Sequence, residues 1–197
     1  MKRYVAFLGG LNVGGHRVTG PDLVAEFTRL GFTDVATFLA SGNVVFSSER
    51  LSVAQTTAGI EEQLHARFGY AVPTFLRTTE QVHHIAGHQP FPSEAIAASR
   101  GKLQVAMLLE PPDASAQATV RKLSSDEDKL AIDATELYWL PSGGISESDL
   151  DLKTLFAALG PSTMRTVNTV RRIAAKFLSG GAGPPRVSRN QDPRSLG

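Results

Sequence analysis

The sequence contains no cysteine. Disulfides, thiolate nucleophiles and cysteine-based zinc sites are therefore excluded. It also has no apolar run approaching the roughly 18 residues that a membrane helix needs. The apolar stretch that follows Lys2 and Arg3 is too short to be the core of a signal peptide. We therefore expect a cytoplasmic protein that does not contact a membrane.

A strong excess of charge of either sign is also missing. The 197 residues carry a net charge of +1. The arginines that follow Ser179 give the C-terminal tail a charge of +2, which leaves −1 for the rest of the chain. A dedicated nucleic-acid domain gains much of its affinity from many phosphate contacts, so this balance argues against nucleic acid as a partner. The hydrophobic fraction of 42% is ordinary for a folded protein with a packed core.

Glycine, by contrast, is concentrated in one informative place. Residues 4–15 read YVAFLGGLNVGG, a hydrophobic strand that runs into a loop with four glycines and one asparagine. A second marker, Ser41-Gly42-Asn43, lies between two short apolar runs and has the chemistry of a hairpin turn. These two segments are the most distinctive features of the first half of the chain.

The hydrophobic periodicity of residues 3–78 predicts the order β-α-β-β-α-β, which is the ferredoxin-like arrangement. The expected strands are 3–8, 35–39, 44–46 and 72–77, and the expected helices are 21–30 and 53–68. In this topology the third strand lies between the first two and is antiparallel to both. The glycine loop 9–15 and the turn 41–43 should therefore meet at one edge of the sheet.

The second half of the chain predicts a smaller α+β unit. Its expected strands are 103–109, 129–132 and 136–140, and its expected helices are 80–86, 114–123, 152–159 and 167–178. We therefore predict three regions, namely a ferredoxin-like unit over 1–78, a second unit over 79–178 and a disordered tail over 179–197. The sequence shows no internal repeat.

Several of these motifs resemble one family. YVAFLGGLNVGG, LGFTDVATFLASGNVVFSS, RFGYAVPTFLRT and TMRTVNTV are similar to motifs of the bacterial domain of unknown function 1697 family, over about residues 3–178. The resemblance implies an α+β fold with a ferredoxin-like first half. It implies no activity, because the family is named for lacking one.

The chain departs from the family pattern at three places. Gly9 stands where the family usually has arginine, SESDL at 146–150 stands where it tends to have GRSKL, and Val167 stands where it usually has tryptophan. If the family site binds an anion, the loss of basic residues at Gly9, Glu147 and Asp149 weakens that site in this member.

The candidate ligand-binding residues combine the two glycine-containing segments with the start of the last predicted helix. They are Gly10, Asn12, Gly14, Gly15, Ser41, Asn43, Arg165 and Asn168. The glycine loop can either hold an anion with its backbone N–H groups or simply turn the chain over the sheet edge. The Asn and Ser side chains can either form a polar pocket or close their own turns. Arg165 and Asn168 would bind an anion where that helix begins.

Two further clusters invite a metal interpretation. His84 and His88 have the i, i+4 spacing of helical metal ligands, but His83 points to another face, and no HExxH frame is present. We therefore predict that all three are surface histidines and that the chain has no metal site. In the acidic run 147–151, Asp151 is more simply a helix cap than a cation ligand.

No Ser-His-Asp set or pair of catalytic carboxylates is visible, so no catalytic residue and no cofactor are assigned. We favour a non-catalytic module that binds a small polar ligand, with a nucleotide among the candidates. One alternative is an enzyme that acts on a phosphorylated or acidic substrate through Arg17, Lys153 and Arg165. Another is single-stranded nucleic-acid binding on the sheet face, although Tyr4 and Phe46 read more simply as core. The oligomeric state is not indicated.

Overall fold

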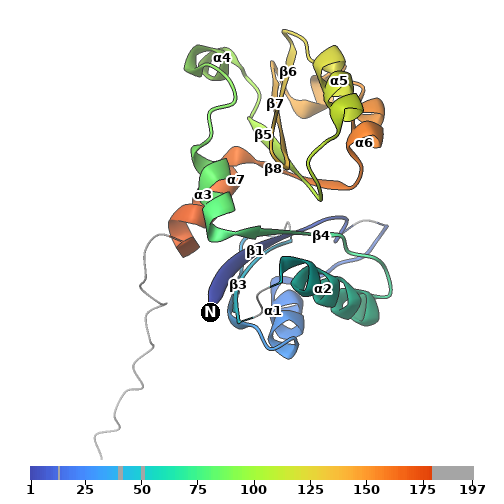
Figure 1. The fold of residues 1–197 in the computed structure, drawn as a ribbon, viewed down its shortest axis with the longest axis vertical. Helices are drawn as coiled ribbons and strands as arrows, with labels where there is room; N and C mark the ends of the chain where they lie inside the picture. The colour runs from blue at the N-terminus through green and yellow to red at the C-terminus, as the bar shows by residue number, and fades with distance from the viewer. Residues whose placement is uncertain (13, 40–41, 50–51, 179–197) are drawn as a thin grey trace, which may run out of the picture.

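The computed structural model of the protein describes residues 1–12, 14–39, 42–49 and 52–178. Across these residues the chain forms two four-stranded antiparallel sheets and seven α-helices, so the α+β class is confirmed (Figure 1). None of the described helices combines the length and the apolar character that a membrane crossing requires. The tail over 179–197, predicted to be disordered, lies outside the described residues.

The first sheet has the strand order β2-β3-β1-β4, and every neighbouring pair is antiparallel. Strand β3 thus lies between β1 and β2, as the predicted topology requires. The elements of this unit are β1 (Lys2–Leu8), α1 (Gly20–Arg29), β2 (Thr33–Thr37), β3 (Asn43–Ser48), α2 (Val53–Phe68) and β4 (Thr74–Thr78). Thr19 caps α1, Ser52 caps α2, and Gly69 ends α2 in the left-handed region at φ 81°.

The second sheet repeats this order as β6-β7-β5-β8. Its elements are β5 (Gln104–Leu108), α5 (Ala114–Leu123), β6 (Asp128–Asp133), β7 (Glu136–Pro141), the 3-10 turn η1 (Ile145–Glu147), α6 (Leu152–Leu159) and β8 (Ser162–Thr166). A helix follows the last strand of each sheet, namely α3 (Thr79–Gly87) after β4, and α7 (Val167–Ile173) with its π-helical turn η2 (Ala174–Leu178) after β8. The short helix α4 (Ser93–Ala98) lies between α3 and β5.

The sequence analysis missed α4, β8 and the repeat. Strand β8 reads Ser-Thr-Met-Arg-Thr, and only Thr163 in it is fully buried, so no apolar pattern marks it as a strand. The repeat is one of topology and register. Val5 pairs with Arg77 across β1 and β4, and Val105 pairs with Arg165 at the equivalent place across β5 and β8. Most of the other side chains differ, which hides the repeat from sequence comparison.

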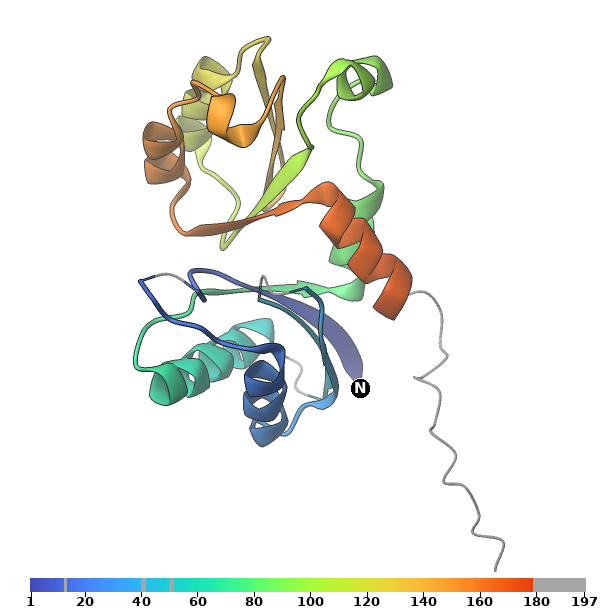
Figure 2. The same ribbon diagram turned by 180° about the vertical axis from the view of Figure 1, so that it is seen from behind.

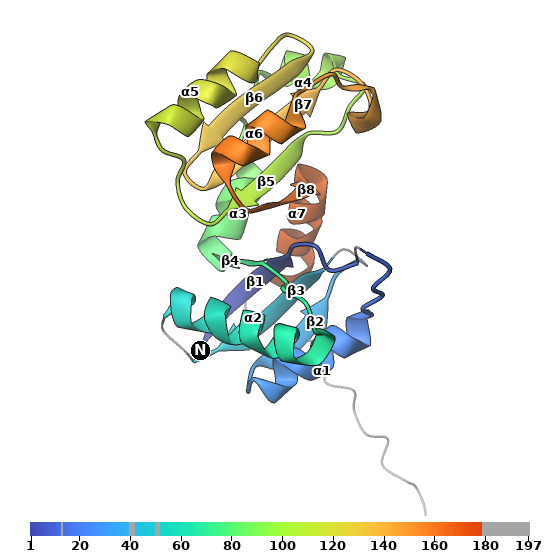
Figure 3. The same cartoon turned by 90° about the vertical axis from the view of Figure 1, so that its right-hand side faces the viewer.

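Three hydrophobic clusters fill the molecule in layers (Figure 3). One cluster packs α1 and α2 against the outer face of the first sheet around Phe46, and another packs α5 and α6 against the outer face of the second sheet around Trp139. The third cluster joins the inner faces of both sheets to α3 and α7, which lie side by side (Figure 2). The two sheets therefore share a core.

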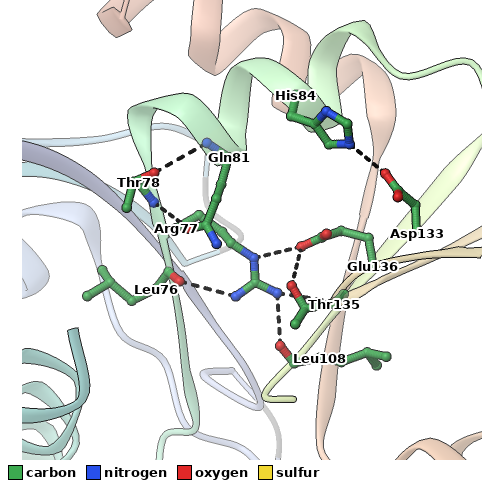
Figure 4. Close-up of polar contacts among 9 residues, drawn as sticks. All are labelled: Leu76, Arg77, Thr78, Gln81, His84, Leu108, Asp133, Thr135 and Glu136. Carbon is green, nitrogen blue, oxygen red and sulfur yellow. Dashed lines mark hydrogen bonds and ion pairs between the residues drawn. The ribbon is translucent and has the colours of Figure 1, made fainter. Parts of the chain in front are cut away.

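A buried ion pair crosses this shared core (Figure 4). Arg77 on β4 donates from Nε to Oε1 of Glu136, at the start of β7, over 2.7 Å, and both side chains are almost fully buried. Its Nη2 donates to the carbonyl oxygen of Leu108 at 2.8 Å, where β5 ends, and to that of Thr135 at 3.3 Å. Strand β4 of the first sheet is thus bonded to the ends of β5 and β7, the two central strands of the second sheet.

We expect Arg77→Met to lower the free energy of unfolding by about 3–5 kcal/mol, because the Glu136 carboxylate would stay buried without its cation. The double variant Arg77→Met/Glu136→Leu should recover much of this loss, because no buried charge remains. Urea denaturation of each variant measures both effects. Arg121→Met, which removes an exposed arginine, should stay within about 0.5 kcal/mol of the wild type. A loss below about 1 kcal/mol in Arg77→Met would contradict the role of this pair.

Candidate functional site

Arg165, a predicted anion contact, lies inside the boundary between the two sheets. It stands on β8, before the start of α7, so the prediction that it opens the last helix is wrong. Its Nε donates to Oδ1 of Asn43 at 2.7 Å, and its Nη2 donates to the carbonyl oxygens of Leu8 at 2.9 Å and Gly42 at 3.4 Å. These contacts mirror those of Arg77, with the roles of the two sheets exchanged.

The two arginines differ in the group opposite them. Glu136 is a carboxylate, whereas the equivalent residue, Asn43, is a neutral amide that is fully buried. Burial lowers the pKa of Arg165 to about 10, so its guanidinium stays charged at neutral pH. Asn43 also donates from Nδ2 to the carbonyl oxygen of Phe38 at 2.8 Å. Asn43 thus links the turn before β3 to the second sheet.

The glycine loop and the β2–β3 turn meet at the sheet edge, where the topology predicts them. The backbone N–H of Leu8 donates to the carbonyl oxygen of Gly42 at 2.8 Å. Gly42 has φ 69°, and a Cβ there would lie 3.1 Å from the Leu8 side chain and 3.2 Å from that of Leu11. Both the conformation and the close approach require glycine at this position.

A cavity of about 270 Å³ opens beside this contact. The glycine loop, the first turn of α1 and the segment around Gly42 surround it. Its lining residues are Leu11, Asn12, Arg17, Val18, Thr19, Gly20, Leu23, Leu39 and Gly42. Arg17 is exposed and makes no ion pair with another described residue. The cavity lining therefore combines one cationic residue, one asparagine and several apolar residues.

The glycine loop is held by polar and aromatic contacts of its own. Asn12 accepts a hydrogen bond at Oδ1 from the backbone N–H of Val18 at 2.8 Å, which closes the loop. The Tyr70 hydroxyl donates to the carbonyl oxygen of Leu11 at 2.6 Å, and the His16 ring stacks on Tyr70 with 4.1 Å between centroids. Three glycines of the predicted site are exposed and have positive φ, namely Gly10, Gly14 and Gly15.

The start of α1 is capped by a reciprocal pair of hydrogen bonds. The Thr19 hydroxyl accepts from the backbone N–H of Asp22, and the Asp22 carboxylate accepts from the backbone N–H of Thr19 at 2.9 Å. Hydrogen bonds from the Thr19 hydroxyl and from the Thr19 backbone N–H lower the pKa of Asp22. The N–H groups of Thr19 and Asp22 are therefore used in the cap and are not offered to an anion.

Of the described residues in the predicted site, only Asn12 lines this cavity. Asn168 is exposed in the first turn of α7, beyond β8. Ser41 lies outside the described residues. The structure thus divides the predicted residues that it describes into an exposed loop group, a boundary pair of Asn43 and Arg165, and an isolated Asn168.

The acidic run at 147–151 lines a second hollow, of about 530 Å³, in the second unit. Asp151 caps α6 by accepting from the backbone N–H of Thr154 at 2.9 Å, as predicted. Glu147 accepts from the backbone N–H of Gly144 at 3.1 Å. Hydrogen bonds from Thr154 lower the pKa of Asp151. Two carboxylates of the run are therefore used in local turns.

The buried position of Gly9 has room for a Cβ atom. A Cβ there would lie 3.4 Å from the Phe75 ring and 3.5 Å from the carbonyl oxygen of Pro73, which are ordinary contact distances. Its backbone N–H donates to that carbonyl at 2.8 Å. Neither a positive φ nor a close contact of a Cβ therefore requires glycine at this position.

We expect Arg165→Ala to destabilise the fold by about 1–3 kcal/mol, because the oxygens of Leu8 and Asn43 each lose one hydrogen-bond donor. Asn43→Ala should destabilise it as well, and the double variant should lose less than the sum, because the two side chains contact each other. Chemical denaturation of the three variants gives this coupling. Asn168→Ala is the control and should stay within about 0.5 kcal/mol of the wild type. Additive losses for Arg165 and Asn43 would refute the pairing.

The structure is similar to that of the conserved bacterial protein SP0830 from Streptococcus pneumoniae, with a TM-score of 0.71. The match covers 88% of this chain and 97% of that chain at 24% sequence identity, so the likeness concerns the fold alone. No curated protein matches the sequence. A family described as "Protein of unknown function (DUF1697)" matches residues 1–138. The match covers well over half of the sequence, and the chain belongs to the DUF1697 family.

Proposed function

We propose that the protein is a non-catalytic module that binds a small polar ligand in the cavity between the glycine loop and the start of α1. The observation that carries this proposal is the position of Arg17, an exposed cation without an ion-pair partner among the described residues, in the lining of a cavity that also contains Asn12. Ligand sites typically combine an apolar lining with a few convergent polar groups.

The size and charge of the cavity narrow the ligand class. Its volume of about 270 Å³ falls just below the about 300–1,000 Å³ that is typical of sites for drug-sized molecules. The cavity would hold a small anion, or the phosphate end of a nucleotide whose base stays outside. Arg17 supplies a charge that suits a phosphate or carboxylate group.

We infer that each unit has a ferredoxin-like core. The split strand order β2-β3-β1-β4, with antiparallel pairing throughout, supports this for the first unit, and β6-β7-β5-β8 supports it for the second. In this arrangement the cavity lies where β1 leaves the sheet, beside the β2–β3 turn. The boundary between the units at residue 79 remains a proposal, because the two sheets share one core.

The enzyme alternative receives less support. It requires Arg17, Lys153 and Arg165 to act on one substrate. Lys153 is exposed on α6, over the outer face of the second sheet, whereas Arg165 is bonded within the boundary between the sheets. Because Arg165 donates to oxygen atoms at the boundary between the sheets, we assign it a role in stability.

Binding of single-stranded nucleic acid on a sheet face is also disfavoured. Tyr4 and Phe46 are buried under α1 and α2, as core residues. The opposite face of the same sheet is covered by the shared core. Base stacking needs exposed aromatic rings, and the described strands of this sheet offer none.

We expect Arg17→Ala to abolish the rise in melting temperature that inorganic phosphate or adenosine monophosphate gives with the wild-type protein beyond the general stabilisation by excluded salts. A ligand that binds the native state raises the melting temperature as its concentration increases. The unliganded melting temperature should hardly change, because Arg17 is exposed. Thermal denaturation over a range of ligand concentrations measures both quantities.

Lys153→Ala is the matched control, since it removes an exposed cation from the other unit. It should keep the wild-type response to phosphate. An equal loss in both variants would point to general electrostatic attraction, and an unchanged response in Arg17→Ala would place the ligand elsewhere. Either result would reject the proposed site.

A further inference from the structure

Three metal-ligating side chains converge where α3 meets the β6–β7 hairpin. His84 and His88 come from α3, and Asp133 ends β6. The Nε2 atom of His84 lies 2.5 Å from Oδ2 of Asp133, and Nδ1 of His88 lies 3.6 Å from the same oxygen. One ligand atom from each residue lies within 4.8 Å of the other two. Figure 4 shows the His84 and Asp133 side chains pointing toward each other.

The sequence analysis predicted three surface histidines, and the structure separates them into two environments. His83 turns away, and its Nε2 lies 3.4 Å from the carbonyl oxygen of Leu178, at the end of η2. His84 and His88 share the other side of the helix, with their ring centroids 5.4 Å apart. Their third partner is about 45 residues away in the sequence, on the other sheet, so no local motif could reveal it.

We propose that His84, His88 and Asp133 form a binding site for a divalent transition-metal ion. Ligand atoms that are about 2.1 Å from a tetrahedral ion lie roughly 3.4 Å from one another. The present separations of 2.5 and 3.6 Å lie on either side of this value. The His84 side chain is more than half exposed, so its ring has room to rotate and admit the ion.

The ligand set indicates which ions the site accepts. Two imidazoles and one carboxylate suit Zn²⁺, Ni²⁺, Cu²⁺ or Fe²⁺, whereas Mg²⁺ and Ca²⁺ prefer sites built from oxygen alone. Three protein ligands leave at least one coordination position for water or another small ligand.

An aromatic ring beside the site restrains the His88 side chain, and nearby carboxylates favour a bound cation. The His88 ring packs on the Tyr138 ring with 4.9 Å between centroids, and His88 is only partly exposed. The carboxylates of Glu136 and Asp133 place negative charge near the Tyr138 ring. Since Glu136 is already paired with Arg77, Asp133 is the carboxylate at this corner that remains to bind a metal ion.

A bound ion would tie the two halves of the chain together. Helix α3 follows the last strand of the first sheet, and Asp133 belongs to the second sheet. The ion would therefore add a link across the same boundary that Arg77 and Arg165 cross. Metal binding should raise the melting temperature of the whole molecule, because the ligands are brought together only in the folded state.

The test is calorimetric titration of the full, untagged chain with Zn²⁺, alongside thermal denaturation with and without the ion. We expect one Zn²⁺ per chain and a higher melting temperature. His84→Ala, His88→Ala and Asp133→Asn should each weaken Zn²⁺ binding by more than the about 10–100-fold that loss of an outer-shell partner typically causes. His83→Ala is the matched control and should bind Zn²⁺ as the wild type does.

Several results would overturn the site. One is a wild-type chain that binds Zn²⁺ no better than the His84→Ala/His88→Ala double variant. Another is an equal loss in His83→Ala, because that ring faces Leu178. Full affinity in Asp133→Asn would also reject it, since the two histidines of α3 would then suffice. Circular dichroism of each variant shows that any loss of binding occurs in a folded protein.

Discussion

Two arginines at the boundary between the sheets, Arg77 buried and Arg165 partly buried, set the relation between the halves of this molecule. Arg77 reaches from the first sheet to Leu108 and Glu136, and Arg165 reaches from the second sheet to Leu8 and Asn43. Each satisfies carbonyl oxygens at a strand end, where the backbone has left its ladder and needs a donor. The apolar core around α3 and α7 supplies most of the driving force for packing the sheets. The arginines fix the position in which they pack, because a hydrogen bond is directional and apolar burial is not.

This arrangement changes how the polar residues of the chain are understood. From the sequence, Asn43 and Arg165 are candidates for a ligand site together with the glycine loop. In the structure Asn43 and Arg165 bond to each other, and they hold the edge of the first sheet against the second. The cavity beside them is lined by Asn12 and Arg17, which lie on the loop itself. The exposed polar side chains at this end of the sheet therefore belong to the loop and to the segment that leads to α1, while Asn43 and Arg165 bond the two sheets to each other.

Much of the fold could be predicted because its signals are local. Helices α2, α5 and α6 begin and end at the predicted residues, since their caps and apolar stripes are short-range features. The meeting of the glycine loop with Gly42 followed from strand order alone. Strand β8 could not be predicted, because four of its five residues are polar and Arg165 is held by contacts with the other sheet. The grouping of His84 and His88 with Asp133 could not be predicted either, because these residues are distant in the sequence and belong to different units.

The reciprocal contacts have the form of an isologous interface, the kind that a twofold axis produces between identical subunits. In a homodimer one residue serves both copies of such a contact, so a change alters the two together. In this protein the two equivalent contacts lie in one chain and differ from each other. Glu136 lies opposite Arg77, and Asn43 lies opposite Arg165. At one end of the boundary Arg77 pairs with a carboxylate, and at the other end Arg165 donates to an amide oxygen. A single chain can therefore change the chemistry at one end of its pseudo-symmetric boundary while the other end stays as it is.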